Sequence, residues 1–258
     1  MTILVVGDTH VDDEQDLSRF DTLGKMIMDQ RPEEIILIGD FLTLNCLSAW
    51  DKNKRLKMEG KRYFSEIDAG NEALDKMLNP IIDDNKKRRK RKEKQYKPKI
   101  VYLEGNHEDR LNRYFDTDPT FMGRLNVKED LKLDDRGIDW VPYREYYYTN
   151  DIGFTHVPFN KVAPISGVDI TRKAQMVTVK SVVFGHIHEQ HLSHVHKIGM
   201  PHLQDTYCCG CFISKKEDYV HGRVTNYWRG VTILHPYKLG RFDIESYSLG
   251  RMERIYND

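Results

Sequence analysis

The feature that most constrains this chain is a set of five short segments in which Asp, Asn or His follows an apolar run. Four runs, at residues 3–6, 35–38, 100–103 and 182–184, have the composition of buried strands, and a shorter run at 152–154 precedes the fifth segment. Polar residues that follow strands of an α/β sheet meet at one edge, where ligands bind. The segments are Gly7-Asp8-Thr9-His10, Gly39-Asp40, Gly105-Asn106-His107-Glu108, Thr155-His156 and Gly185-His186-Ile187-His188.

These segments combine carboxylate and amide oxygens with imidazole nitrogens, the mixed ligand set that a pair of divalent transition-metal ions requires. Asp40 is the candidate that bridges two ions through its two carboxylate oxygens. Asp8 and His10, two residues apart, can reach one ion across a tight turn, and His186 and His188 have the same spacing. Each segment alone is more often an ordinary turn, whereas five of them in one chain indicate a dinuclear metal centre.

The order of the runs predicts an α/β fold of two packed mixed β-sheets flanked by helices. The first unit is a strand at 2–6, an amphipathic helix at about 16–30 and a strand at 35–38, so these two strands should be parallel neighbours. After residue 138 the sequence pattern changes to short runs of β-branched or aromatic residues, which predict further strands, some of them in a second sheet. These runs lie at 143–149, 152–155, 177–184, 231–235 and 242–248.

We expect residues 1–258 to form a single domain with a helical and basic insertion at about 45–99. The insertion carries a helical stripe that ends near Pro80, followed by a basic run, Lys86–Lys99. The run holds ten of the chain's 40 basic residues and one of its 40 acidic residues, so the rest of the chain is acidic. It is either a solvated loop or a contact for the phosphate backbone of DNA or RNA, on which Tyr96 could stack a base.

No apolar stretch is long enough to cross a membrane, and we expect residues 2–6 to form a strand and not a signal peptide, which favours a cytoplasmic location. The cysteines fit that compartment, because Cys208, Cys209 and Cys211 are too close together for a framework of separated disulfides. A structural zinc site that combines Cys208 or Cys211 with His202 or His196 is conceivable. Buried cysteines in a strand are the better interpretation.

The order of the five segments resembles that of the calcineurin-like metallophosphoesterase superfamily, over residues 7–188. The resemblance implies a four-layer αββα sandwich with two divalent metal ions that hydrolyses phosphate esters. Manganese is the favoured metal, with iron, zinc or nickel as alternatives. Carried over residue by residue, the resemblance implies that one metal is held by Asp8, His10, Asp40 and His188, and the other by Asp40, Asn106, His156 and His186.

In such a site two ions, roughly 3.5–4 Å apart, lower the pKa of a bridging water and clamp the phosphate oxygens. The resulting hydroxide attacks phosphorus in line, without a covalent enzyme intermediate. His107 matches the family histidine that contacts the phosphate and assists the leaving group. Asp40 and His107 are therefore the candidate catalytic residues, and Asn106 and Arg110 are the candidate contacts to substrate.

One segment departs from the family pattern. Many members continue the second motif with an Asp that orients the catalytic histidine and an Arg that binds phosphate, whereas this chain has Thr43 at the first position and no arginine after it. Either another group such as Asp12 orients His107, or acid catalysis is weaker here. The missing arginine argues against a serine/threonine protein phosphatase. Arg110 could supply the phosphate contact, or it could be a surface helix residue.

The function we predict is that of a dinuclear-metal-dependent phosphodiesterase or nuclease, acting on nucleic acid or a nucleotide. The alternative is a phosphomonoesterase acting on a nucleotide or phosphoprotein, and a third hypothesis is a non-catalytic nucleic-acid-binding module. Three further histidines follow the last motif, and we expect them to lie at the rim of the site or in a loop. They are His191, His194 and His196.

Overall fold

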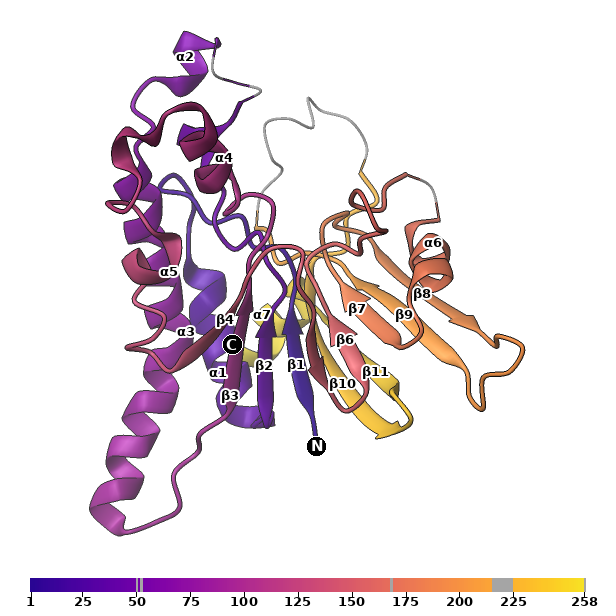
Figure 1. Ribbon diagram of the computed structural model, residues 1–258. Coiled ribbons are helices and arrows are strands. Elements are labelled where there is room, and N and C mark those ends of the chain that lie inside the picture. Colours follow the sequence, from indigo (N-terminus) through magenta and orange to yellow (C-terminus); the bar gives the residue numbers. More distant parts are fainter. Residues whose placement is uncertain (50, 52, 168, 215–224, 258) are drawn as a thin grey trace.

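The computed structural model describes residues 1–49, 51, 53–167, 169–214 and 225–257, and its strands form two packed sheets (Figure 1). In spatial order the first sheet contains β11 (Arg241–Ser248), β10 (Gly230–Lys238), β1 (Ile3–Val6), β2 (Glu34–Leu37), β3 (Lys99–Leu103) and β4 (Ile138–Val141). The second sheet contains β5 (Tyr147–Thr149), β6 (Ile152–Phe154), β7 (Ser181–Phe184), β9 (Gln204–Cys209) and β8 (Gln190–Val195).

Helices cover the outer faces of both sheets. The long helices α1 (Ser18–Gln30) and α3 (Tyr63–Arg91) pack together on the first sheet with α7 (Leu249–Tyr256), and α6 (Ile170–Val177) covers the second sheet. The remaining helical segments are η1 (Asn45–Leu47), α2 (Arg55–Met58), α4 (Arg110–Thr117), η2 (Pro119–Phe121) and α5 (Val127–Asp130). The predicted α/β sandwich of two mixed sheets flanked by helices is therefore confirmed.

The apolar core is divided into layers by the two sheets. Along β1, Leu4 and Val6 face the cluster beneath α1 and α3, whereas Ile3 and Val5 face the cluster between the sheets. A third cluster lies between the second sheet and α6. Because β1 is buried on both faces, its sequence is a continuous apolar run rather than an alternating one. This burial fixes β1 and thereby the loop that follows it.

The strands that precede the five polar segments point the same way. β1 pairs with β2 in parallel, as predicted, and β2 with β3 and β6 with β7 are parallel too. A bridge between Asp8 and Cys211 joins the loop after β1 to the segment after β9, so the two sheets meet at their carboxyl ends. All five polar segments consequently reach one end of the sandwich.

Two strands, β4 and β8, were not predicted, and β9 was expected only as a strand that holds the buried cysteines. β9 is a mixed sequence in which even Gln204 and Asp205 are buried, so its hydrophobic pattern is weak. The strand predicted at 177–184 is shorter in the structure: Val177 is the last residue of α6, and β7 begins only at Ser181. The predicted strand at 143–149 is confined to β5.

The predicted end of the insertion helix near Pro80 was wrong, because α3 continues through the proline to Arg91. A Cβ on Gly24 of α1 would lie only 2.9 Å from the Pro80 ring, so the glycine makes room for the proline at the α1–α3 contact. Arg88 pairs with Asp84 one turn earlier on the extended helix. The first half of the basic run is therefore helical and is not a loop.

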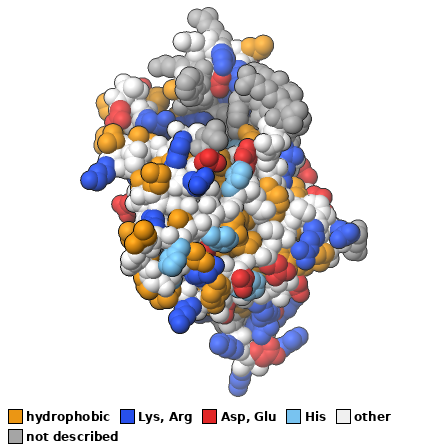
Figure 2. Space-filling model, turned by 90° about the vertical axis from the view of Figure 1, so that its right-hand side faces the viewer, with side chains coloured by type: hydrophobic (Ala, Val, Ile, Leu, Met, Phe, Trp, Pro, Cys, Tyr) orange, Lys and Arg blue, Asp and Glu red, His pale blue; other side chains and the backbone are white. Residues whose placement is uncertain are grey.

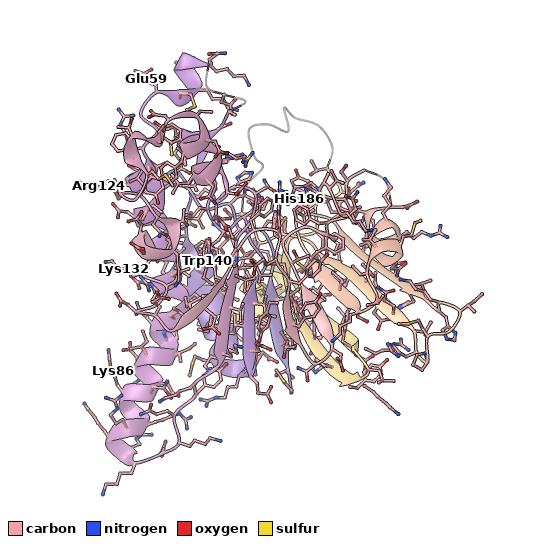
Figure 3. All side chains as sticks on the ribbon, in the orientation of Figure 1. Glu59, Lys86, Arg124, Lys132, Trp140 and His186 are labelled. Atoms are coloured by element: carbon pink, nitrogen blue, oxygen red, sulfur yellow. The ribbon has the colours of Figure 1, made fainter. Side chains whose placement is uncertain are left out.

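The basic run lies at the end of the sandwich opposite the polar segments. Figure 3 shows Lys86 and His186 at opposite ends of the structure, and the lowest side chains in Figure 2, at the height where α3 ends in Figure 1, are mostly Lys and Arg. Tyr96 is not available for base stacking, because it is half-buried and its hydroxyl donates to the Pro32 carbonyl at 2.6 Å. Within the described residues no helix is both long and apolar enough to span a membrane.

Candidate metal centre

Asp8 joins the carboxyl ends of the two sheets. It follows β1, and its Oδ2 lies 3.1 Å from Nε2 of His188, which follows β7. Nε2 of His10 lies 3.1 Å from Nε2 of His188 and 4.0 Å from the same Asp8 oxygen. Both Asp8 oxygens also accept the main-chain N–H of His186 at 3.0 Å. Asp8 and His10 therefore converge with His188, as their spacing predicted, whereas within the described residues the His186 side chain groups with Asp40 and His156 and does not share an ion site with His188.

Asp40 lies between this group and the residues that follow β3 and β6. Its Oδ2 is 3.3 Å from Nε2 of His156, 3.8 Å from Nε2 of His107 and 3.9 Å from Nε2 of His10. Its Oδ1 accepts the main-chain N–H of His107 at 2.8 Å. On the far side, the Asn106 Oδ1 lies 3.0 Å from Nε2 of His156. Asp40 thus has the central position expected of a bridging ligand.

Three overlapping groups of side chains could each hold a metal ion, since the ligand atoms within each group lie within 4.8 Å of one another. The overlap occurs at His10 and Asp40, so the groups form one continuous cluster. The groups are Asp8, His10 and His188; His10, Asp40 and His107; and Asp40, His156 and His186. With Asn106 beside His156, the structure brings together all seven residues predicted as metal ligands.

The donor set and its surroundings fit divalent ions. Nδ1 of His156 lies 3.2 Å from the Ile38 carbonyl, an acceptor, so Nδ1 carries the hydrogen and Nε2 faces Asp40. Metal-binding histidines characteristically have this arrangement. Although burial disfavours the imidazolium, the Asp40 carboxylate raises the pKa of His156 to about 9. Burial opposes ionisation of Asp40 as well, yet His107 and His156 hold its pKa well below the usual range. The centre therefore favours a cation beside Asp40.

The backbone at four of the candidate ligands lies in the left-handed region. The φ angles are 46° at His10, 47° at Asp40, 72° at His186 and 60° at His188. This conformation costs roughly 1–2 kcal/mol for a residue that is not glycine. Such strain typically occurs where function requires a side chain to be aimed in one direction. Here each strained residue directs its side chain into the cluster.

Two glycines allow the ligand loops to approach each other. A Cβ on Gly185 would lie 2.2 Å from Oδ1 of Asp8, and a Cβ on Gly105 would lie 2.1 Å from the main-chain nitrogen of Asp40. No side chain fits at either position without displacing a candidate ligand. These glycines are required for close approach, whatever their own φ angles.

Glu108 connects the loops after β2 and β3. Its Oε2 accepts the main-chain N–H of Asp40 at 3.1 Å and of Gly105 at 2.9 Å. Its Oε1 accepts the N–H of Leu42 at 2.8 Å and the hydroxyl of Tyr102 at 2.9 Å. The side chain is fully buried, and four donors satisfy its two oxygens. Glu108 therefore positions Asp40 through the backbone.

His107 is oriented by a main-chain carbonyl and not by a carboxylate. Its Nδ1 donates to the Thr43 carbonyl at 2.8 Å. Thr43 stands where many family members have an Asp, so the residue at this position still orients the histidine, but through its backbone. Asp12, which we considered for this role, instead accepts the N–H of Glu14. Burial lowers the pKa of His107 to about 4, and Nε2 accepts from Arg110 at 3.0 Å.

Arg110 is part of the site and not a surface residue. It is the first residue of α4, and its Nη1 donates to the carbonyls of Thr43 at 2.7 Å and Leu44 at 3.3 Å. Its Nη2 reaches His107. The guanidinium is thus fixed beside the cluster, at a place where it can contact a phosphate oxygen.

The sequence analysis missed two positioning groups. Glu108 belongs to the third segment but received no role, although a carboxylate directly after the candidate catalytic His107 and two residues before a helix was a visible signal. The role of the Thr43 carbonyl could not be predicted from the sequence, because every residue has a main-chain carbonyl whatever its type. Tyr102, which donates to Glu108, looked like any other strand residue of β3.

The other histidines and the cysteines lie outside the metal-capable groups found among the described residues. His191 and His194 lie on edge strand β8 and contact Glu189 and Asp205, so they do not lie in a loop, and a position at the rim of the site stays a prediction for them. Cys208 is buried in β9 and donates to the Gly185 carbonyl, which fits the buried-cysteine interpretation better than zinc. His196 Nε2 lies 3.0 Å from the Met200 carbonyl.

Comparison with known proteins agrees with this geometry. A family model described as calcineurin-like phosphoesterase matches residues 1–190. The matched segment includes all seven candidate ligands, His107, Glu108 and Arg110. No curated protein matches the sequence.

Replacement of Glu108 by Gln should destabilise the protein. The amide nitrogen cannot accept from the main-chain N–H groups, so buried donors lose their partner at a cost of about 1–3 kcal/mol. Urea unfolding would measure the change, with Glu72→Gln as the control because Glu72 is exposed on α3. Equal stability of the two variants would contradict the positioning role.

The close approach at Gly185 can be tested through metal binding. In Gly185→Ala the new Cβ displaces Asp8, so the rise in melting temperature produced by Mn²⁺ in the unmodified protein should disappear. Gly250→Ala is the matched control, because nothing lies within 4 Å of a Cβ there. An unchanged Mn²⁺ effect in Gly185→Ala would show that Asp8 does not hold the ion.

Proposed function

Because the chain belongs to the calcineurin-like phosphoesterase family, it is a metal-dependent phosphoric ester hydrolase, and we propose that its substrates are phosphodiesters of nucleotides or nucleic acid. The proposal assigns two divalent ions to the cluster, with manganese favoured over iron, zinc and nickel. The seven predicted ligands would hold these ions.

The observation that carries the preference for diesters is the charge beside the cluster. Among the described residues, Arg110 is the buried arginine that contacts a candidate catalytic residue, His107. Arg113 is nearby, but it is more than half exposed and paired with Asp109 at 3.2 Å. Arg110 is held by main-chain carbonyls and not by a close carboxylate, and one such arginine suits the one negative charge of a phosphodiester better than the two charges of a phosphomonoester.

When bound, the divalent ions would supply Lewis-acid activation of water and neutralise charge on the phosphate. Asp40 is placed to contact both halves of the cluster. Arg110 can donate to a phosphate oxygen that projects beyond the ligands. His107 is locked through Nδ1, so its Nε2 keeps one direction, toward Asp40 and Arg110. Because burial keeps the ring neutral, Nε2 would have to gain a proton before it could donate to a departing oxygen.

The basic run lies far from the candidate metal centre, which limits how a nucleic acid could contact both. β3 is five residues long and α3 continues about ten residues past its last buried side chain, which separates the helical part of the run, at 86–91, from the centre by roughly 30 Å. Lys86–Lys99 therefore cannot line the centre. A polymer would have to extend along the molecule to contact both.

We also propose that residues 1–258 act as one domain in a reducing compartment such as the cytoplasm. Support for one domain comes from β10, which lies late in the chain and pairs with β1 at the middle of the first sheet. Support for the compartment comes from Cys208 and Cys209, which are adjacent, buried and not joined in a disulfide.

With Mn²⁺, the protein should hydrolyse bis(p-nitrophenyl) phosphate faster than p-nitrophenyl phosphate. Asp40→Asn should lower kcat/KM by more than about a hundredfold, because loss of a residue that merely hydrogen-bonds a metal ligand already costs up to that much. Asn tolerates the positive φ at this position, so the variant should fold. Initial rates and circular dichroism measure both effects.

Turnover of the monoester alone would overturn the diesterase proposal and favour a phosphomonoesterase. Absence of turnover with every metal, together with retained binding of DNA, would favour a non-catalytic nucleic-acid-binding module.

The basic run should matter only for long polymers. A duplex rises about 3.4 Å per base pair, so one of about six base pairs cannot reach from the centre to α3's end. Neutralising three lysines of the basic run should lower the rate at which a long duplex is cleaved and make that rate less dependent on salt concentration. Cleavage of the short duplex should not change. The variant replaces Lys86, Lys87 and Lys90 by Gln, and the charge-matched control replaces Lys173, Lys180 and Lys238. Equal loss on both lengths would contradict the separation of run and centre, and no loss on either would contradict a role of the run in binding a polymer.

A further inference from the structure

A pocket of about 300 Å³ opens beside the candidate metal centre. It lies between η1 and α2 of the insertion on one side and α4 on the other, elements near the top of Figure 1. Asn106 and Arg110 belong both to the centre and to the lining of this pocket. A group bonded to a phosphate held at the centre would therefore enter the pocket directly.

The pocket has two chemically different walls. Arg110 and Arg113 form a polar wall with Asn106 at its inner end. Leu47 and Met58 contribute the apolar wall from the insertion. Arg110 is already held by two main-chain carbonyls, so little of its side-chain entropy remains to be lost when it binds a ligand. Guanidinium groups both donate hydrogen bonds and stack on planar rings.

The volume limits the size of the occupant. About 300 Å³ is at the lower end of the range for small-molecule sites, so the pocket has room for a single base with its sugar but not for a stretch of polymer. The apolar wall opposite the arginines matches a planar heterocycle that carries hydrogen-bond acceptors. The basic run, which could track a polymer, lies at the other end of the sandwich.

We propose that this pocket binds one nucleoside-type group of the substrate, which makes the preferred substrate a nucleotide-sized phosphodiester. The inference rests on the proposed phosphodiesterase function and adds to it the source of specificity. Leu47 and Met58 of the insertion supply the apolar wall, so they select the organic group while the strand ends hold the phosphate.

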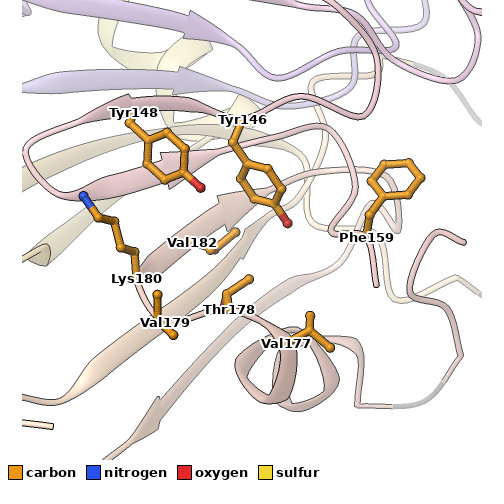
Figure 4. Close-up of a pocket in the computed structure, with 8 residues that line it drawn as sticks. All are labelled: Tyr146, Tyr148, Phe159, Val177, Thr178, Val179, Lys180 and Val182. Carbon is orange, nitrogen blue, oxygen red and sulfur yellow. The ribbon is translucent and has the colours of Figure 1, made fainter. Parts of the chain in front are cut away.

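A second pocket, of about 330 Å³, provides a control (Figure 4). It lies over β5 and β7 of the second sheet, and Tyr146, Tyr148 and Val179 are among its lining residues. None of the candidate ligands lines it, and Lys180 at its edge is paired with Asp151 at 2.9 Å. This pocket has apolar surface but no connection to the centre.

The test compares two diesters that share the leaving group, p-nitrophenyl thymidine 5′-phosphate and methyl p-nitrophenyl phosphate. The unmodified protein with Mn²⁺ should show kcat/KM at least about tenfold higher for the thymidine ester. Ala49→Trp places a large ring in the pocket from an exposed position and should reduce this ratio toward one. Thr117→Trp does so from the opposite wall, and Val179→Trp in the second pocket should leave the ratio unchanged.

A ratio near one in the unmodified protein, or a ratio unaffected by both pocket variants, would overturn the inference while the phosphodiesterase function stands. If neither ester is hydrolysed, the proposed function fails, and calorimetric titration still tests the pocket. Thymidine 5′-monophosphate should then bind at least about tenfold more tightly than inorganic phosphate, and Ala49→Trp should remove the difference. Equal binding of the two probes would overturn the inference independently of turnover.

Discussion

The centre depends on the buried carboxylate of Glu108, which binds the backbone of two neighbouring ligand loops at once. A side chain that accepts from Asp40, Leu42 and Gly105 fixes the separation of the loops after β2 and β3. Asp40 then fixes the rest, because the N–H groups of Thr9 and His10 donate to its main-chain carbonyl at 3.1 and 3.0 Å. Three strand ends are thereby held in register before any ion contributes.

This rigidity explains how the protein can hold several like-charged or strained groups together. The imidazoles of His10, His107 and His188 lie within one buried cluster, and burial and their mutual proximity lower the pKa of His10 well below its ordinary value. Such an arrangement is unfavourable for the chain alone and becomes favourable when cations are shared among the ligands. The packing of the apolar layers holds the ligands in this arrangement, and the preformed arrangement increases the affinity for metal ions.

Much of the site could be predicted from the sequence, because parallel strands bring their carboxyl ends to one edge and the ligand types are carried by side chains. Asp8, Asp40 and His156 were predictable for this reason. The Thr43 carbonyl was not, since a backbone acceptor depends on loop conformation rather than on residue identity. Helix α3 through Pro80 depends equally on a tertiary contact, the space left by Gly24. The bounds of β9 could not be predicted beyond its cysteines, because its buried polar residues obscure the strand pattern.

The pairing of β1 with β10 has a consequence for how the chain folds. Ile3 lies opposite Leu234, so the strand that carries the first ligands has one open edge until a segment far along the sequence has been synthesised. Contacts between such distant segments slow folding, and an unpaired apolar strand edge invites association with other chains. The nascent protein therefore completes its hydrolytic centre late, and truncation before β10 would yield an aggregation-prone product rather than a smaller enzyme.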